Sequence, residues 1–234
     1  MRLLSVNTGP LRPGPPDGRP TGIVKQPVVG AVLVAPPGPR GTVALAGDAV
    51  GDARHHGGVD QAVYAYARED LDRWERELGR DLAAGTFGEN FTTVGVDVTG
   101  ALIGERWRIG PDVVLEVSSP RIPCATFEGQ MGVPGWIARF MAAGRPGAYL
   151  RVVVAGEVRA GDPVEVVHRP DHDVTIGVTF RAMTLEPELL PSLLRADALP
   201  EQIVERARRR TGTGSTSAAR TATVEPSDVG GLDA

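Results

Sequence analysis

The feature that most constrains the fold is a series of short apolar segments, rich in β-branched and aromatic residues. Glycine, proline and aspartate separate these segments, a pattern typical of short strands joined by turns. The segments do not alternate regularly with helix-length segments, so the sequence predicts a mainly β, mostly antiparallel barrel or sandwich, not a doubly wound sheet. The predicted strands are residues 2–7, 28–35, 41–47, 61–67, 106–110, 112–118, 148–156 and 163–169.

Two helices are predicted to interrupt these strands. Residues 68–80 place Leu71, Trp74 and Leu78 on one face of a helix. Residues 135–144 have an apolar face with the same helical spacing. The expected fold is therefore β-rich with a few helices.

The pattern changes after about residue 173. Residues 174–183 are predicted to form one more strand, and residues 186–196 and 199–210 two short helices. Residues 211–234 have too little apolar surface to offset the entropy of ordering, so we predict that they are disordered. The predicted organisation is a β-rich domain over residues 1–173, a small helical domain over 174–210 and a disordered tail over 211–234.

Charge and cysteine content exclude several classes of protein. The formal net charge of -4 gives no electrostatic reason to expect binding to nucleic acid or to an anionic membrane. The chain begins without the apolar core of a signal peptide, and no apolar run reaches the length of a membrane span, so we expect a cytoplasmic protein. Cys124 is the sole cysteine and cannot form an internal disulfide, an iron–sulfur cluster or a cysteine-based zinc site.

Lysine is as rare as cysteine in this chain. Among the 25 basic residues, Lys25 is the single lysine. Such a chain retains a lysine most readily where the wide planar group of arginine does not fit, although chance survival at the surface is the alternative. The same scarcity excludes a Walker A phosphate loop, and the sequence contains no G-x-S-x-G, H-E-x-x-H or G-x-G-x-x-G motif.

The segment 47–58, GDAVGDARHHGG, combines glycines with charged residues and two adjacent histidines. Glycines let backbone N–H groups approach an anion closely, and Arg54, His55 and His56 add charge or hydrogen-bond donors. The alternative is a tight turn with histidines packed beneath it. On an extended backbone His55 and His56 point to opposite faces, so we expect one of them to be structural.

Cys124 lies in the segment VSSPRIPCATFEG. Pro120 and Pro123 prevent a regular element there, so Cys124 is predicted to lie on a stiff loop after a strand. Arg121 would favour the thiolate form of Cys124. The alternative is an inert, buried cysteine.

Three further polar segments carry weaker signals. Asn90, in GTFGENFTT, offers both donors and acceptors, although capping its own turn is the simpler role. His168 and His172 have the spacing of one helical turn, but Pro170 between them indicates a linker. The basic residues within 206–210 are interpreted as a solvated helix end.

Taken together, four segments resemble the MOSC domain family. They are, in order, TGIVKQPV, LAGDAVGDARHHGGVDQAVYAYAREDLDRWE, GTFGENFTTVGVDVTGALIGERWRIG and LEVSSPRIPCATF. The resemblance covers roughly residues 1–210 and is closest to a bacterial branch that reduces N-hydroxylated purines and related compounds. It implies a MOSC-type β-barrel with a few helices and a small C-terminal helical appendage.

The resemblance also implies a molybdenum–pterin cofactor, with Cys124 as the ligand that the protein gives to molybdenum. Thiolate is a soft ligand that suits such a centre. A histidine of the glycine-rich loop, such as His56, would supply protons. The implied cofactor-binding residues are Lys25, Arg54, His55 or His56, Gly57, Gly58, Asn90 and Arg121.

Three functions stay open on the sequence. The first is reduction of a small N-hydroxylated substrate. The second is sulfur transfer through a persulfide on Cys124, and the third is non-catalytic storage or delivery of the cofactor. A reductase would need electrons from a separate donor protein, because the chain offers neither an iron–sulfur cluster nor a dinucleotide-binding motif.

Overall fold

The computed structural model of the protein describes residues 1–217, whose central feature is a mixed sheet of eight strands. The strand order is β12-β8-β9-β10-β6-β7-β1-β4, and only the β6–β7 pair is parallel. The strands are β1 (Arg2–Thr8), β4 (Gln26–Pro27), β6 (Val63–Ala67), β7 (Phe91–Val94), β8 (Arg106–Ile109), β9 (Val113–Pro120), β10 (Ala148–Val154) and β12 (Val164–His168). Two smaller antiparallel pairs join β5 (Val32–Val34) to β11 (Gly156–Val158) and β2 (Arg12–Pro13) to β3 (Pro20–Thr21).

The sheet of the predicted MOSC-type β-barrel is not fully closed, because β12 and β4 are its edge strands. A single isolated bridge pairs Arg2 at the start of β1 with Pro163, next to β12. Backbone hydrogen bonds flank that bridge, from the N–H of Leu3 to the carbonyl oxygen of Asp162 at 2.8 Å and from the N–H of Val164 to the carbonyl oxygen of Met1 at 3.1 Å. The start of β1 therefore meets the segment that leads into β12. The prediction of a mainly β fold with helices is confirmed.

The predicted strand over residues 41–47 is also wrong. Gly41 has φ 92°, a left-handed conformation that interrupts an extended strand, and only one bridge, between Val34 and Leu45, remains. In contrast, β7 begins within GTFGENFTT, a segment for which the sequence indicated only a turn capped by Asn90. Its Phe91 is buried because β7 lies inside the sheet, between β6 and β1.

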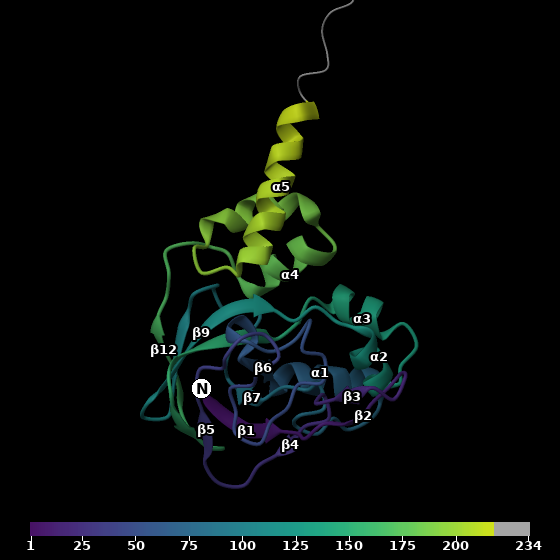
Figure 1. Ribbon diagram of the computed structural model, residues 1–234, viewed down its shortest axis with the longest axis vertical. Coiled ribbons are helices and arrows are strands. Elements are labelled where there is room, and N and C mark those ends of the chain that lie inside the picture. The colour runs from purple at the N-terminus through teal and green to yellow at the C-terminus, as the bar shows by residue number, and fades with distance from the viewer. Residues whose placement is uncertain (218–234) are drawn as a thin grey trace, which may run out of the picture.

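Helices α1 (Arg68–Leu78), α2 (Ala125–Met131) and α3 (Trp136–Ala143) gather on one side of the sheet (Figure 1). Helix α1 confirms the prediction, since Leu71 and Trp74 are buried and Gly79 ends the helix in a left-handed conformation. An aromatic cluster joins the three helices. The ring centroids of Trp74 and Trp136 lie 4.6 Å apart, and those of Phe127 and Phe140 5.1 Å apart.

A helical segment stands beyond the sheet and consists of α4 (Ile176–Thr184), the 3-10 helix η2 (Pro187–Arg195) and α5 (Glu201–Ser217) (Figure 1). The predicted strand over residues 174–183 is wrong. Thr175 caps α4 by accepting a hydrogen bond from the N–H of Val178 at 3.1 Å, and Ile176 and Phe180 are buried at helical spacing.

The two predicted helices are confirmed as η2 and α5. Helix α5 ends at Ser217, so residues 211–217 are helical and not part of a disordered tail. The rest of that predicted tail, residues 218–234, lies outside the described residues. Within residues 1–217, no helix combines the length and the hydropathy needed to cross a bilayer.

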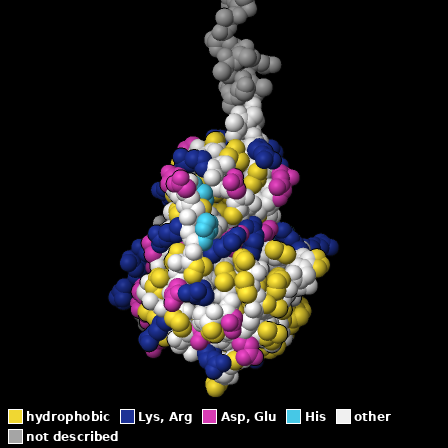
Figure 2. Space-filling view, turned by 90° about the vertical axis from the view of Figure 1, so that its left-hand side faces the viewer, with side chains coloured by type: hydrophobic (Ala, Val, Ile, Leu, Met, Phe, Trp, Pro, Cys, Tyr) yellow, Lys and Arg dark blue, Asp and Glu magenta, His cyan; other side chains and the backbone are white. Residues whose placement is uncertain are grey.

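The helical segment is tied to the sheet by both polar and apolar contacts. Arg151 of β10 donates from Nη1 to the carbonyl oxygen of Ala198 at 2.7 Å. The rings of Phe180 and Phe140 meet edge to face, with centroids 6.2 Å apart. A space-filling view shows basic side chains along the junction between the helical segment and the rest of the molecule (Figure 2).

Candidate functional site

A cleft of about 1170 Å³ brings together most of the residues singled out in the sequence. Its walls come from the segment 48–57, the segment 119–126 and the helical segment. The predicted site residues that line it are Lys25, Arg54, His55, His56, Gly57, Asn90, Arg121 and Cys124. Gly58 does not line the cleft.

Cys124 follows β9 and immediately precedes α2. Its backbone is extended, with φ -132° and ψ 169°, and its side chain is half-buried in the cleft wall. Residues 121–124 have no regular structure, as Pro123 predicted. The sequence did not predict α2, whose Phe127 is fully buried and fixes the position of the Cys124 loop.

The surroundings of Cys124 lower the pKa of its thiol. Burial opposes ionisation, but a hydrogen bond with His56, the positive charge of Arg121 and the backbone N–H of Phe127 outweigh it and bring the pKa to about 7. A thiol with this pKa is partly thiolate at neutral pH, and thiolate is the form that binds metals and attacks electrophiles.

Arg121 acts from inside the protein. Its Nη1 donates to the carbonyl oxygen of Phe87, and its guanidinium carbon lies 3.8 Å from the ring centroid of Phe127 and 5.2 Å from that of Tyr64. The side chain is 5% exposed. Arg121 is therefore a fixed internal charge close to Cys124.

The two adjacent histidines have different surroundings. His56 is partly buried and is the histidine that lowers the pKa of Cys124. His55 turns away, and its Nδ1 lies 2.7 Å from Oδ2 of Asp52, with 74% of the His55 side chain exposed. Both histidines line the cleft, but His56 acts on the thiol whereas His55 is paired with Asp52 and exposed.

Gly57 and Gly58 both have positive φ, 78° and 79°. A Cβ at Gly57 would lie 2.6 Å from the carbonyl oxygen of Thr42, and one at Gly58 would lie 2.9 Å from Cα of Arg40. The two glycines therefore let the histidine loop pack tightly against residues 40–42. The carbonyl oxygen of Arg54 accepts a hydrogen bond from Arg40 at 3.2 Å, and the Arg54 side chain is exposed.

Lys25 belongs to a buried polar network. Its Nζ pairs with Oδ1 of Asp48, and the two side chains are 8% and 6% exposed. Asn90 donates from Nδ2 to Oδ2 of Asp48 at 2.8 Å and accepts at Oδ1 from the N–H of Tyr64 at 3.1 Å. Burial lowers the pKa of Lys25, while Asp48 opposes that shift. Asn90 thus joins three distant segments and does not merely cap its own turn.

Glu89 is a fully buried carboxylate next to this network. Its Oε1 accepts from the N–H of Gly85 at 2.6 Å and from Oγ1 of Thr92 at 2.9 Å, and its Oε2 accepts from the N–H of Phe87 at 3.0 Å. Burial raises the pKa of Glu89. Glu89 fixes the turn whose Phe87 carbonyl receives the guanidinium of Arg121.

Sequence comparison assigns the chain that forms this cleft to a known family. Residues 52–165 match the model of the MOSC domain. YflK of Bacillus subtilis is 32% identical over 176 residues, which cover 74% of this chain and 76% of YflK. The chain belongs to the MOSC domain family.

Two further comparisons give other similar proteins. The crystal structure of YiiM from Geobacillus stearothermophilus has a TM-score of 0.72 and 25% identity to this chain, covering 89% of this chain and 98% of YiiM. A protein of Gibberella moniliformis called a reductase is 31% identical over 172 residues, which cover 72% of this chain and 29% of that protein.

Several residues of this MOSC cleft were not predicted from the sequence. Asp48 lies in the glycine-rich segment. In the sequence, the one hint of its role was that the single lysine, Lys25, would need a carboxylate partner. Met183 and Gln202 had no signal, because only the packing of the helical segment brings them to the cleft. Lining residues that the sequence did not predict include Asp48, Gln61, Tyr64, Tyr149, Met183 and Gln202.

The donor set of the cleft limits what kind of metal centre it could hold. Among residues 1–217, no cluster of three or more His, Cys, Asp or Glu side chains could chelate an ion. A soft metal at Cys124 would therefore need to bring most of its ligands with it. Nearby, the buried Oε1 of Gln61 has no hydrogen-bond partner among the described residues, so an acceptor is left for a ligand in the cleft.

Proposed function

We propose that this MOSC protein binds a molybdenum–pterin cofactor in the cleft and reduces small N-hydroxylated compounds, such as N-hydroxylated bases, at a molybdenum centre ligated by Cys124. The observation that carries the proposal is the single thiol of Cys124, which lines a large cleft. Among residues 1–217, no cluster of three or more His, Cys, Asp or Glu side chains lies there that could chelate an ion without it. A relative called a reductase supports the enzymatic class.

The residues present fit such a cofactor. Cys124 would give one soft ligand from Sγ, and the remaining ligands would belong to the cofactor. Gln61 lines the cleft, and its Oε1, which has no partner among the described residues, would be available to accept a hydrogen bond. Lys25 and Asn90 reach the cleft from the buried side, while Arg54 and His55 reach it from the rim and can bind an anionic group.

The bound cofactor would supply the two electrons that break the N–O bond. Residues of the chain would supply the remaining chemistry. The imidazole of His56 gives a proton to the hydroxyl oxygen, which leaves as water, and solvent restores that proton. A hydroxylamine thus takes up two electrons and two protons and yields an amine and one water. Arg121 and the glycines at 57 and 58 act indirectly, by fixing Cys124 and the histidine loop.

The electrons would come from a separate reductase that carries a flavin or a haem. Such redox contacts are transient and small, near or below about 1,200 Å². Reduced nicotinamide cofactor alone should therefore give no turnover, whereas a reduced viologen should replace the partner protein.

The test is to purify the protein from a host that makes the cofactor and to measure molybdenum per chain together with reduction of hydroxylaminopurine by a reduced viologen. Stoichiometric molybdenum with turnover is expected, and Cys124→Ser should lose both. Full metal and activity in Cys124→Ser would contradict the proposal.

A persulfide carrier is the second candidate, because the lowered pKa of Cys124 would also favour sulfur transfer. Intact-mass analysis of freshly purified protein would then show one additional sulfur on Cys124 and no stoichiometric molybdenum. Molybdenum without turnover would indicate instead a protein that stores or delivers the cofactor.

A further inference from the structure

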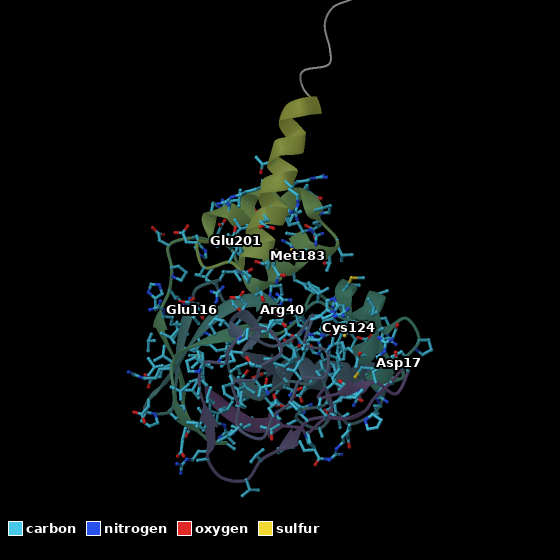
Figure 3. The ribbon with its side chains drawn as sticks, viewed as in Figure 1. Asp17, Arg40, Glu116, Cys124, Met183 and Glu201 are labelled. Atoms are coloured by element: carbon cyan, nitrogen blue, oxygen red, sulfur yellow. The ribbon has the colours of Figure 1, made fainter. Side chains whose placement is uncertain are left out.

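The helical segment forms part of the cleft that contains Cys124. Met183 of α4 and Gln202 of α5 line it, and both lie beyond the residues 52–165 that match the MOSC model. Figure 3 shows Met183 at the edge of the helical segment nearest the sheet-containing part, and Cys124 at the facing edge of that part. The cleft is therefore completed by residues outside the matched MOSC region.

The side chains of Met183 and Gln202 belong to helices that are held in place by buried contacts. Helix α4 is fixed by Phe180, which is fully buried and meets the aromatic cluster through Phe140. The start of α5 is fixed by Ile203, which is 4% exposed, and by the bond from Arg151 to the carbonyl of Ala198 just before it. The helical wall of the cleft is consequently preformed.

The chemistry of this wall is specific. Met183 is half-buried and offers a polarisable thioether, which packs well against aromatic rings. Gln202 is exposed and offers one acceptor and two donors on a planar amide. A planar amide can bond to the ring nitrogen and the exocyclic amine of a heteroaromatic base at the same time, as glutamine does with adenine.

The cleft also contains aromatic side chains. Tyr64 and Tyr149 line it, and their ring centroids lie 5.2 Å apart. Tyr64 is 3% exposed and its ring faces Arg121, so the half-buried Tyr149 offers the aromatic contact. An aromatic ring and a thioether favour a flat, apolar ring system, and the amide favours a ring that carries nitrogen donors and acceptors at its edge. A short aliphatic hydroxylamine would use neither feature.

We infer that Met183 and Gln202 determine substrate specificity, with Met183 packing on the substrate ring and Gln202 hydrogen-bonding to its nitrogen-bearing edge. The wall thereby selects planar N-hydroxylated heterocycles over aliphatic hydroxylamines. This inference rests on the proposed function, in that the cleft is where the substrate is reduced.

The test compares two substrates in the molybdenum-loaded enzyme with a reduced viologen as donor. The quantity is the ratio of kcat/KM for hydroxylaminopurine to kcat/KM for N-methylhydroxylamine. Because a bidentate amide contact gives about tenfold discrimination or more, Gln202→Ala should lower this ratio about tenfold, and Met183→Ala should lower it less. The matched control is Glu201→Ala, which changes the neighbouring residue on α5, with a side chain 75% exposed and outside the cleft lining.

An unchanged ratio in both Gln202→Ala and Met183→Ala would overturn the inference. Met183→Leu, which conserves volume, replaces Met183→Ala if the latter lowers the melting temperature. Glu201→Ala should keep the wild-type ratio, and a fall there equal to that of Gln202→Ala would also overturn it.

A binding experiment separates failure of this inference from failure of the proposed function. Saturation-transfer NMR with adenine needs no turnover. If the wild-type protein reduces neither substrate, the proposed function fails, yet weaker adenine binding in Gln202→Ala than in wild type would still support the helical wall as a base-binding surface. Equal adenine binding in wild type and Gln202→Ala would overturn it.

Discussion

Two walls of the cleft hold their polar groups in opposite ways. The sheet wall is the side with Lys25 and Asp48, which line the cleft, are nearly buried and pair with each other. The fully buried Glu89 lies behind this wall and is not part of the cleft lining. The loop wall contains Arg54 and His55, which are exposed. Both walls meet at Cys124, where buried Arg121 acts from one side and His56 from the other.

This contrast indicates that the two walls have different roles. Buried, paired groups keep fixed positions, so the sheet wall suits a tightly held cofactor. Groups on a solvated loop exchange protons readily with water, so the loop wall suits proton delivery. It follows that substitutions in the sheet wall should cost stability, whereas substitutions in the loop wall should mainly change the chemistry of Cys124.

The largest effect on stability is expected from Glu89→Ala. It leaves the buried donors of Gly85, Phe87 and Thr92 without their acceptor, and should lower the free energy of unfolding by about 3 kcal/mol. Urea denaturation measures the change. Glu89→Gln keeps the shape and one acceptor oxygen, so it should cost less. Equal stability of Glu89→Ala and wild type would break the contrast between the walls.

Lys25→Arg should have the next largest effect. The guanidinium is wider than the ammonium group and must fit beside Asp48 at a site where the lysine side chain is 8% exposed. We expect a loss of about 1–3 kcal/mol, typical of overpacking, together with weaker cofactor retention. Thermal denaturation and molybdenum content check both expectations. Wild-type values for both would mean that this position tolerates either cation.

His56→Ala should change the titration of Cys124 with little loss of stability. The thiol pKa of about 7 lies below its usual value of 9.0, so in cofactor-free wild type the rate of iodoacetamide alkylation should rise around pH 7. Without the His56 hydrogen bond, that midpoint should move upward. A lowered pKa also means that thiolate stabilisation of the fold is lost as pH falls from about 9 towards 7. An unchanged alkylation midpoint in His56→Ala would contradict the proposed pairing.

The smallest effect is expected from His55→Ala, the matched control. Its side chain is 74% exposed and pairs with Asp52 at the surface, so unfolding free energy should change by no more than about 0.5 kcal/mol. The alkylation midpoint of Cys124 should stay at the wild-type value. A shift as large as that of His56→Ala would show that the two histidines act together.

The sequence predicted what depends on local chemistry. Pro123 correctly indicated irregular structure just before Cys124, whereas Pro120 is the last residue of β9 and pairs with Ala148. The spacing of Leu71 and Trp74 correctly predicted α1. A strand was wrongly predicted over residues 174–183 because Val, Ile and Thr favour strands. A helix forms there instead, because Thr175 caps it and its buried residues have helical spacing.

The rest of the site depends on contacts between distant segments. Asp48 meets Lys25 across 23 residues and Asn90 across 42, and no local pattern specifies either pair. Which histidine faces Cys124 depends on a turn packed against residues 40–42, through glycines whose positive φ is not visible in the sequence. Gln202 reaches the cleft only because α5 is docked on the sheet-containing part.

The most direct test of the account is molybdenum K-edge X-ray absorption of the loaded protein, which counts the sulfur ligands of the metal. The account predicts that Cys124→Ser loses the metal or, where some is retained, shows one sulfur ligand fewer than wild type. His55→Ala should give the wild-type spectrum. Full metal loading in Cys124→Ser with the same number of sulfur ligands as wild type would contradict the central claim that Cys124 binds molybdenum.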